Sequence, residues 1–239
     1  MLEDEKKQLI LRKSADRGFA DHGWLQSHHT FSFADYYDEK FMGFGVLRVI
    51  NEDIIKGGAG FATHGHKDME ILTYVVEGAL EHKDSMGNQS IIYPGEVQRM
   101  SAGMGVRHSE FNHLKNSRTH LLQIWIVPDK MNLAPGYEQK SFLPELKKNQ
   151  PILVASKEGK NNSVRIHQEV EIYVLKATSS GKIQFQLSQF ENYWLQVICG
   201  DILIDNNKLL TGDAIGLRQT KSCTLQWSQG AHLLLFALP

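Results

Sequence analysis

Short apolar runs, broken by turn residues, recur along the whole chain. The runs are rich in β-branched and aromatic side chains, and glycine or asparagine follows many of them. Long stretches with apolar residues at helical spacing are missing. This pattern predicts an all-β protein, with strands over 46–50, 71–76, 90–93, 121–127, 170–175, 182–187, 193–199 and 232–238.

Turn chemistry and proline divide the chain into two parts. Residues 84–88 and 205–207 have the composition of hairpin loops. The strand pattern lapses between Pro128 and Pro151, where we expect a linker with a helical turn over 144–148. The predicted domains are therefore residues 1–135 and 151–239, joined by a linker over 136–150, and both have an ordinary domain size.

Composition and charge exclude some classes of protein. The chain has 239 residues, an apolar content of 41% and a formal net charge of −1. It lacks the basic excess of a nucleic-acid-binding protein, so direct nucleic-acid binding is disfavoured. A charged N-terminus and the absence of a long apolar run predict a cytoplasmic protein without a membrane span. We expect Cys199 and Cys223 to stay reduced.

Two short motifs carry the candidate chemistry. His64-Gly-His66 and His108-Ser-Glu110 each place two potential ligands two residues apart, which puts both on one face of a strand. If the two strands are neighbours in a sheet, three imidazoles and a carboxylate can meet at one ion. Such donors suit Fe, Ni, Mn, Co, Cu or Zn, and four ligands on a six-coordinate ion leave room for a substrate.

Several alternatives stay open at this point. A single His-x-His is usually a pair of surface histidines, and metal binding is favoured here because Gly58, Gly105 and Asn112 add fixed spacings around the motifs. Glu70 shares strand parity with the first pair and competes with Glu110 as the carboxylate ligand. The remaining histidines of this half are expected to be structural or exposed, with His28 and His29 able to line a pocket entrance: His22, His28, His29, His82, His113 and His120.

The second half repeats the first only faintly. A shared glycine and hairpin pattern places Gln186 and Ser188 where His64 and His66 stand in the first half. The only histidines after the linker are His167 and His232. We therefore expect a C-terminal domain of similar fold without a comparable metal site.

The spacing of glycines, histidines and glutamate resembles the two motifs of the cupin superfamily. A longer series of segments resembles its pirin family, especially the bacterial members similar to quercetin dioxygenase, and it covers about residues 10–130. In contrast to the general cupin pattern, Gly103 stands where proline is usual. The segments that carry the resemblance are 29–37, 47–51, 64–71, 73–75, 81–88, 98–103 and 108–112.

The resemblance implies a fold and a ligand set. The fold is a bicupin, with two β-barrel or jelly-roll-like domains facing each other and a metal ion, most often iron, in the first. By motif position, the ligands are His64, His66, His108 and Glu110.

Two functions follow from the resemblance, and we favour the first. An enzyme similar to quercetin dioxygenase would insert both atoms of O2 into a flavonol and open its central ring. Glu110 is then the expected catalytic base, with Glu70 as the second choice. The alternative is a metal- or redox-sensing protein that acts on a transcription-related protein partner. For the flat substrate, the candidate slot residues are Phe44, Phe61, Met69 and Phe111.

Overall fold

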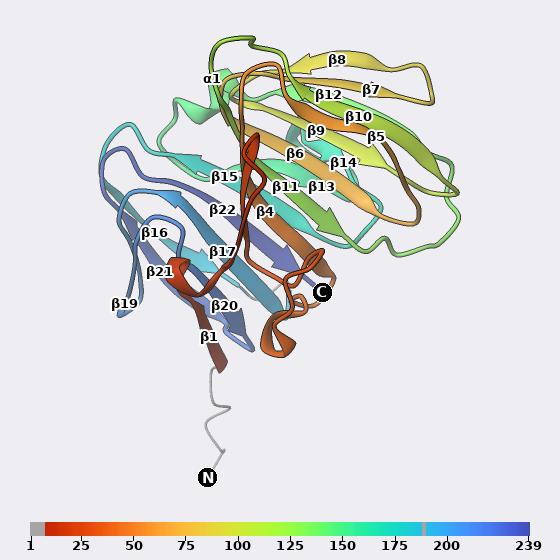
Figure 1. Cartoon of the computed structure of the whole chain (residues 1–239). Helices are drawn as coiled ribbons and strands as arrows, with labels where there is room; N and C mark the ends of the chain where they lie inside the picture. Colours follow the sequence, from red (N-terminus) through yellow and green to blue (C-terminus); the bar gives the residue numbers. More distant parts are fainter. Residues whose placement is uncertain (1–7, 188–189) are drawn as a thin grey trace. The chain divides into compact units, whose positions relative to one another are not determined.

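The computed structural model describes residues 8–187 and 190–239, and most of them lie in strands (Figure 1). Each of the eight predicted strands is present, so the all-β prediction is confirmed. None of the helices in these residues could span a membrane. Cys199 and Cys223 are not joined in a disulfide. The charged N-terminal residues 1–7 lie outside the described residues. So does Ser188, which the faint repeat places where His66 stands in the first half.

The chain forms two compact units that are not consecutive in sequence. The unit that carries the histidine motifs contains residues 17–143 and 156–168. Its elements are β2 (Gly18–Asp21), β3 (Leu25–His29), η2 (Glu39–Phe41), β4 (Leu47–Ile55), β5 (Gly60–His66), β6 (Glu70–Glu77), β7 (Leu80–Asp84), β8 (Gln89–Ile92), β9 (Glu96–Ser101), β10 (Val106–Asn112), β11 (Thr119–Ile126), β12 (Gly136–Ser141), η3 (Lys160–Asn162) and β14 (Val164–Arg165).

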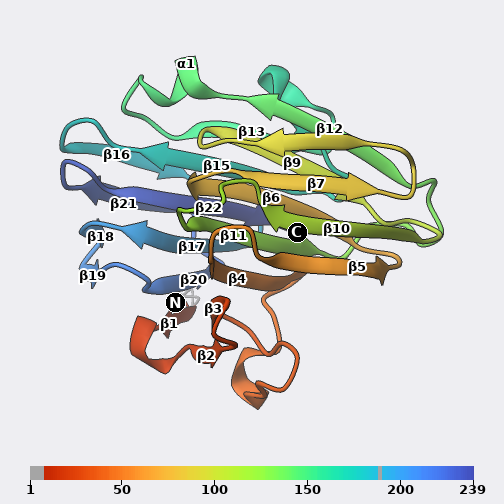
Figure 2. The ribbon, with the colours of Figure 1, turned by 45° about the horizontal axis from the view of Figure 1, so that its top comes forward.

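Two antiparallel sheets build this unit. The smaller has the order β5-β10-β7-β8 and the larger has the order β12-β9-β6-β11-β4-β3-β2 (Figure 1, Figure 2). Leu80 and Ile92 of the smaller sheet pack against Val75 and Leu121 of the larger one. Burying each such side chain contributes roughly 1.5–3 kcal/mol, so this apolar cluster holds one end of the sandwich closed.

The stretch that composition suggests to be a linker contains regular structure. β12 pairs with β9, and the α-helix α1 (Leu143–Leu146) overlaps the predicted helical turn. The strand has no apolar alternation to reveal it, because its side chains are half-buried or exposed along its whole length. An edge strand of this kind is formed by its backbone ladder rather than by a buried face.

The second unit contains the described residues up to 16, with 144–155 and 169–239. Its larger sheet includes the run β1-β20-β17-β22-β15-β13, and its smaller sheet has the order β16-β21-β18-β19. The elements are β1 (Gln8–Arg12), η1 (Ser14–Asp16), β13 (Ile152–Ser156), β15 (Glu171–Lys176), β16 (Gly181–Gln186), β17 (Asn192–Cys199), β18 (Ile202–Ile204), β19 (Asn207–Leu209), β20 (Ala214–Arg218), β21 (Ser222–Trp227) and β22 (His232–Leu238).

Gly103, in the turn before β10, allows a prediction about stability. Its φ is +48°, and a Cβ there would lie 2.0 Å from the carbonyl oxygen of Leu133. Gly103→Ala should therefore lower the free energy of unfolding by about 3 kcal/mol, through both backbone strain and displacement of the facing chain. Gly87 has a φ of +91° with open space around it, so Gly87→Ala should cost only about 1 kcal/mol. Equal losses in urea unfolding would show that the close approach to Leu133 is unimportant.

Candidate metal centre

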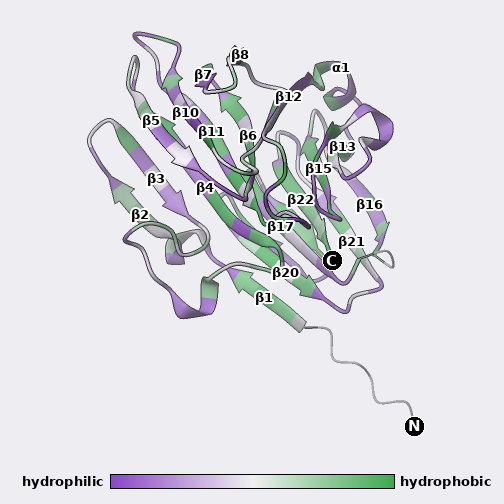
Figure 3. Ribbon diagram, turned by 90° about the vertical axis from the view of Figure 1, so that its right-hand side faces the viewer, coloured by the Kyte–Doolittle hydropathy of each residue, from purple (hydrophilic) through white to green (hydrophobic). Residues whose placement is uncertain are grey.

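The two motif strands are neighbours in one sheet, which was the condition for their side chains to meet at one ion. β5 and β10 pair antiparallel, with His64 directly opposite His108. β10 also pairs with β7, which places Glu110 opposite His82. Between His108 and Glu110 the β5 register shifts by one residue, so Glu110 stands opposite Phe61. The polar end of β5 is coloured purple and white in Figure 3.

Three imidazoles meet at this point of the small sheet. The ring centroids of His64, His66 and His108 lie 4.4–4.8 Å apart, and one nitrogen from each falls within 4.8 Å of the others. Nδ1 of His64 donates to the carbonyl oxygen of Ala62 at 2.8 Å. Because that oxygen can only accept, the proton of neutral His64 sits on Nδ1 and leaves a lone pair on Nε2.

The nitrogens that face the centre of this cluster lack ordinary partners. Nε2 of His64 lies 3.0 Å from Nε2 of His108, and Nε2 of His66 is buried without a hydrogen-bond partner among the described residues. Burial, followed by the charge of neighbouring histidines, lowers the pKa of His66 to about 4 and that of His108 to about 3. Neutral imidazoles with converging lone pairs fit a divalent transition metal ion.

Glu110 belongs to a second cluster that shares His108. It could join His82 and His108 around an ion, and all three side chains are buried. One carboxylate oxygen accepts a hydrogen bond of 2.6 Å from Nε2 of Gln123, and the other accepts one of 3.4 Å from Oγ1 of Thr73. The larger sheet therefore orients the carboxylate that the motif predicts as ligand and base.

Glu70 lies in a different environment. Strand parity placed it on the same face as His64 and His66, but the chain leaves β5 at His66 and Glu70 begins β6 in the larger sheet. Its carboxylate accepts hydrogen bonds from Oγ of Ser101 at 3.0 Å and from the backbone N–H of His167 at 3.1 Å. The parity argument is wrong for Glu70 because His66 and Glu70 do not lie on one continuous strand. Glu70 is in neither cluster of potential ligands.

His82 and Gln123 are site residues that the sequence analysis missed. The ring centroid of His82 lies 5.3 Å from that of His108, and its Nε2 lies 3.1 Å from Oδ2 of Asp84. The available signal for Gln123 was an amide within an otherwise apolar strand, since buried polar groups need partners. For His82 it was the shared parity with Asp84 on a strand that ends in a hairpin.

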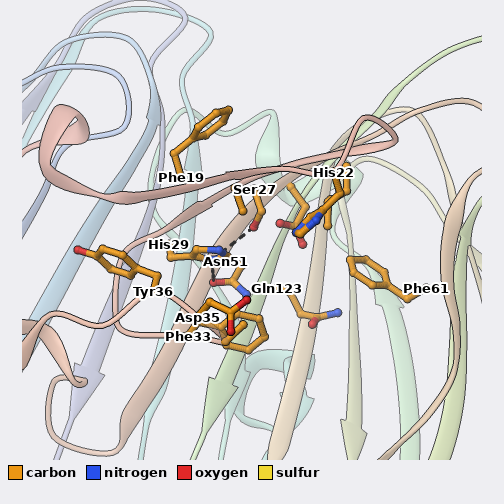
Figure 4. A pocket seen from close by; sticks show the side chains of 14 residues that line it. Phe19, His22, Ser27, His29, Phe33, Asp35, Tyr36, Asn51, Phe61 and Gln123 are labelled. Atoms are coloured by element: carbon orange, nitrogen blue, oxygen red, sulfur yellow. Dashed lines mark hydrogen bonds between the residues drawn. The ribbon is translucent and has the colours of Figure 1, made fainter.

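A cavity of about 410 Å³ lies in the same unit, and the Glu110 partner Gln123 is part of its wall. Gln123, which donates to Glu110, lines it together with Phe61, Phe33 and Tyr36 (Figure 4). Its volume suits a small organic ligand. Trp125 lies between the cavity and the cluster of His64, His66 and His108. Its ring centroid is 4.9 Å from that of His66 and 5.4 Å from that of Phe33, and both contacts are edge-on.

Only part of the predicted slot lies in this cavity. Phe61 lines it, but the other three candidates do not. Phe44 is buried elsewhere, Met69 packs against an apolar cluster that contains Met100, and Phe111 is exposed. Parity again explains the difference for Phe111, which points to the other face of β10 from Glu110.

Of the two histidines predicted to line a pocket entrance, His28 and His29, only one lies in the cavity wall. His29 lines the cavity. His28, the next residue of β3, is not among the lining residues, and its ring packs on Phe19 with the centroids 4.8 Å apart. Adjacent residues of a strand point to opposite faces, so only one of the pair can face the cavity.

Asp53 in β4 is a buried carboxyl group that lines the cavity. Burial, with the negative charges of Glu110 and Glu52, raises its pKa to about 7. Since the unfolded value is about 3.9, the folded state holds this proton more tightly. The stability that this group contributes is complete below about pH 4 and is lost as the pH rises towards 7.

Asp53→Asn should therefore reduce the pH dependence of unfolding. Between about pH 5 and pH 8 the wild-type protein should lose about 2 kcal/mol more unfolding free energy than the variant does. Urea unfolding at both pH values measures this difference. Asp35→Asn is the matched control, because Asp35 is an exposed carboxyl group at the same cavity. The same slope in wild type and Asp53→Asn would contradict the assignment.

Comparison with known proteins agrees with the fold. Residues 11–126 match the family described as Pirin, and residues 153–238 match the quercetinase C-terminal cupin domain. Quercetin 2,3-dioxygenase of Escherichia coli K12 is 45% identical over 97% of this chain and 99% of its own length. A putative quercetin 2,3-dioxygenase of Pasteurella multocida is 40% identical over 90% of this chain and 92% of its own.

Solved structures agree over the whole length. The crystal structure of YhhW from Escherichia coli superposes with a TM-score of 0.93 at 44% identity, covering 97% of this chain and 98% of that one. A complex of bacterial pirin YhhW with nickel(II) has a TM-score of 0.92 at 44% identity, covering 97% of this chain and 99% of that one. Near-complete coverage at this identity shows that the chain is a bicupin of the pirin family.

Proposed function

We propose that this pirin is a metal-dependent dioxygenase that acts on a flavonol-type aromatic substrate. The observation that carries the proposal is the cluster of three imidazoles, with unpartnered nitrogens, beside a cavity lined by aromatic side chains. Relatives of the same length that bear the name quercetin 2,3-dioxygenase support the reaction class. The substrates would be the flavonol and O2.

The residues that would hold the ion are His64, His66, His108 and Glu110. Imidazole and carboxylate donors suit iron, the ion we expect, and nickel is supported by the nickel(II) complex of YhhW. When bound, the ion would act as a Lewis acid that lowers the pKa of a flavonol hydroxyl group. His82 stands next to His108 and would keep that ring in place through its own contact with Asp84.

Glu110 is the expected general base. Its carboxylate is buried and accepts hydrogen bonds on both oxygens, one from Gln123, which lines the cavity, and one from Thr73. A carboxylate held in this way can accept the proton of a substrate hydroxyl group, because each oxygen keeps a further lone pair. The amide of Gln123 is in turn oriented by Trp125, whose Nε1 donates to its oxygen at 3.4 Å.

The cavity walls would select a flat ligand and exclude water. Phe33 and Phe61 supply apolar ring faces and edges, and Trp125 closes the side next to His66. Exclusion of water strengthens the hydrogen bonds around Glu110, since the local dielectric constant falls.

Metal reconstitution tests the proposal. The metal-free protein would be loaded separately with Fe(II), Ni(II), Mn(II), Co(II), Cu(II) or Zn(II), and the loss of quercetin absorbance would be followed with O2 consumption. We expect at least one ion to give turnover with equal amounts of flavonol and O2 consumed. No turnover with any ion would remove the dioxygenase proposal and favour a binding or sensing role for the same site.

A further inference from the structure

A row of polar side chains crosses the interior of the larger sheet. Strand register places Thr73 opposite Gln123, Gln123 opposite Asn51, and Asn51 opposite His29. Thr73 and Gln123 hold Glu110, while Asn51 and His29 continue the row along the cavity wall. Neighbouring strands are about 4.8 Å apart, so His29 lies about 10 Å beyond Gln123 along the row.

A second polar pair stands beside the far end of this row. Ser27 is opposite Asp53 on the same two strands that carry His29 and Asn51. Nδ1 of His29 lies 2.8 Å from Oδ1 of Asn51 and 3.4 Å from Oγ of Ser27 (Figure 4). All four side chains line the cavity and are at most 5% exposed. They form a polar cluster, named here the distal cluster, on the larger sheet, whereas His64, His66 and His108 lie on the smaller one.

Asp53 leaves this cluster incomplete. Ser27 supplies a hydrogen bond to its carboxyl group, but Oδ1 has no hydrogen-bond partner among the described residues. A buried oxygen without a partner costs about 1–3 kcal/mol, which a structural role alone does not explain. A ligand hydroxyl group in the cavity would satisfy it.

We propose that the distal cluster, with Asp53 as its acceptor, binds a phenolic hydroxyl group of an aromatic ligand whose other end lies at Glu110. This inference rests on the proposed function. It adds a preference for flavonols that carry hydroxyl groups on the ring far from His64, His66 and His108. Asp53 lies on the strand next to Gln123 and two residues along it, about 8 Å away, and a flat, multi-ring ligand is long enough to span this separation. His29, Asn51 and Ser27 are positioning residues, because they order the wall around Asp53.

Binding measured without turnover tests this preference. Quercetin and 3-hydroxyflavone share the ring system and the central hydroxyl group, but only quercetin carries hydroxyl groups on the outer rings. Both would be titrated into metal-free protein under nitrogen, and tryptophan fluorescence would report binding, since Trp125 contacts the cavity residue Phe33. We expect quercetin to bind wild-type protein at least about 10-fold more tightly.

Variants at two carboxyl groups of the same cavity separate recognition from general damage. Asp53→Leu should bring the two affinities within about 2-fold, whereas Asp53→Asn, which keeps an acceptor oxygen, should retain part of the preference. Asp35→Leu, at an exposed position of the cavity, should leave it unchanged. Equal affinities in wild type, binding of neither flavonol, or an unchanged preference in Asp53→Leu would each overturn the proposal.

The two proposals fail in different ways. A preference for quercetin without O2 consumption under any metal would remove the dioxygenase and leave the recognition site in place. Turnover of both flavonols with equal kcat/KM, unaffected by Asp53→Leu, would remove the recognition site and leave the dioxygenase in place.

Discussion

His108→Ala is expected to abolish metal binding and, with it, turnover. His108 is the residue that both clusters of potential ligands share, and it stands directly opposite His64 across the strand pair. Removing its imidazole should lower metal affinity by more than about 100-fold, because even indirect partners of a ligand contribute 10–100-fold. Elemental analysis after gel filtration measures the bound metal, and O2 consumption with quercetin measures turnover.

A control histidine distinguishes ligand loss from general damage. His113 is half-exposed, and its Nδ1 lies 3.5 Å from Glu81, away from both clusters. His113→Ala should retain the metal content and turnover of the wild-type protein. Urea unfolding of the metal-free forms gives the structural cost of His108→Ala separately. Full metal occupancy in His108→Ala would mean that the ion binds elsewhere.

Glu110→Gln is expected to lower kcat by about 100- to 1000-fold. The substituted amide cannot accept a proton from the substrate. Its oxygen can still accept from Nε2 of Gln123, as Glu110 does at 2.6 Å, while its NH2 group donates to Oγ1 of Thr73. The variant should therefore keep its fold while losing the base, as stopped-flow absorbance of quercetin would show.

Metal content decides how this loss is interpreted. If Glu110 serves as a ligand as well as a base, Glu110→Gln should also lose metal affinity, whereas a base alone would leave it unchanged. Glu77→Gln provides the control, because the Glu77 side chain is 61% exposed and pairs with Arg118. A Glu110→Gln protein with wild-type kcat at full occupancy would exclude a catalytic role for the carboxylate.

Local periodicity was sufficient to predict eight of the strands and to place both potential ligands of each motif on one strand face. Ligands two residues apart share a face on any regular strand, so His64 and His66 could be assigned to one face without knowledge of the sheet. β12 could not be predicted in this way, because an edge strand with half-buried side chains has no apolar alternation.

Information about neighbouring strands was needed for the rest of the site. Glu70 kept its parity only on the assumption that β5 continued past His66. His82 and Gln123 reach Glu110 or His108 from other strands, far away in sequence. Asp53 becomes chemically unusual only through burial, which sequence alone does not give. Contacts between strands therefore determine which side chains surround Glu110 and His108, whereas the sequence motifs indicate only where the site lies.

The register shift in β5 has a consequence for how this site could change over evolutionary time. Phe61 and His64 are three residues apart and would face opposite ways on a regular strand. The shift lets Phe61 line the cavity while His64 faces the other imidazoles, and the carbonyl oxygen of Ala62 accepts a hydrogen bond from Nδ1 of His64. A one-codon deletion at 62–63 would preserve the backbone ladder yet turn either the aromatic wall or the imidazole outward.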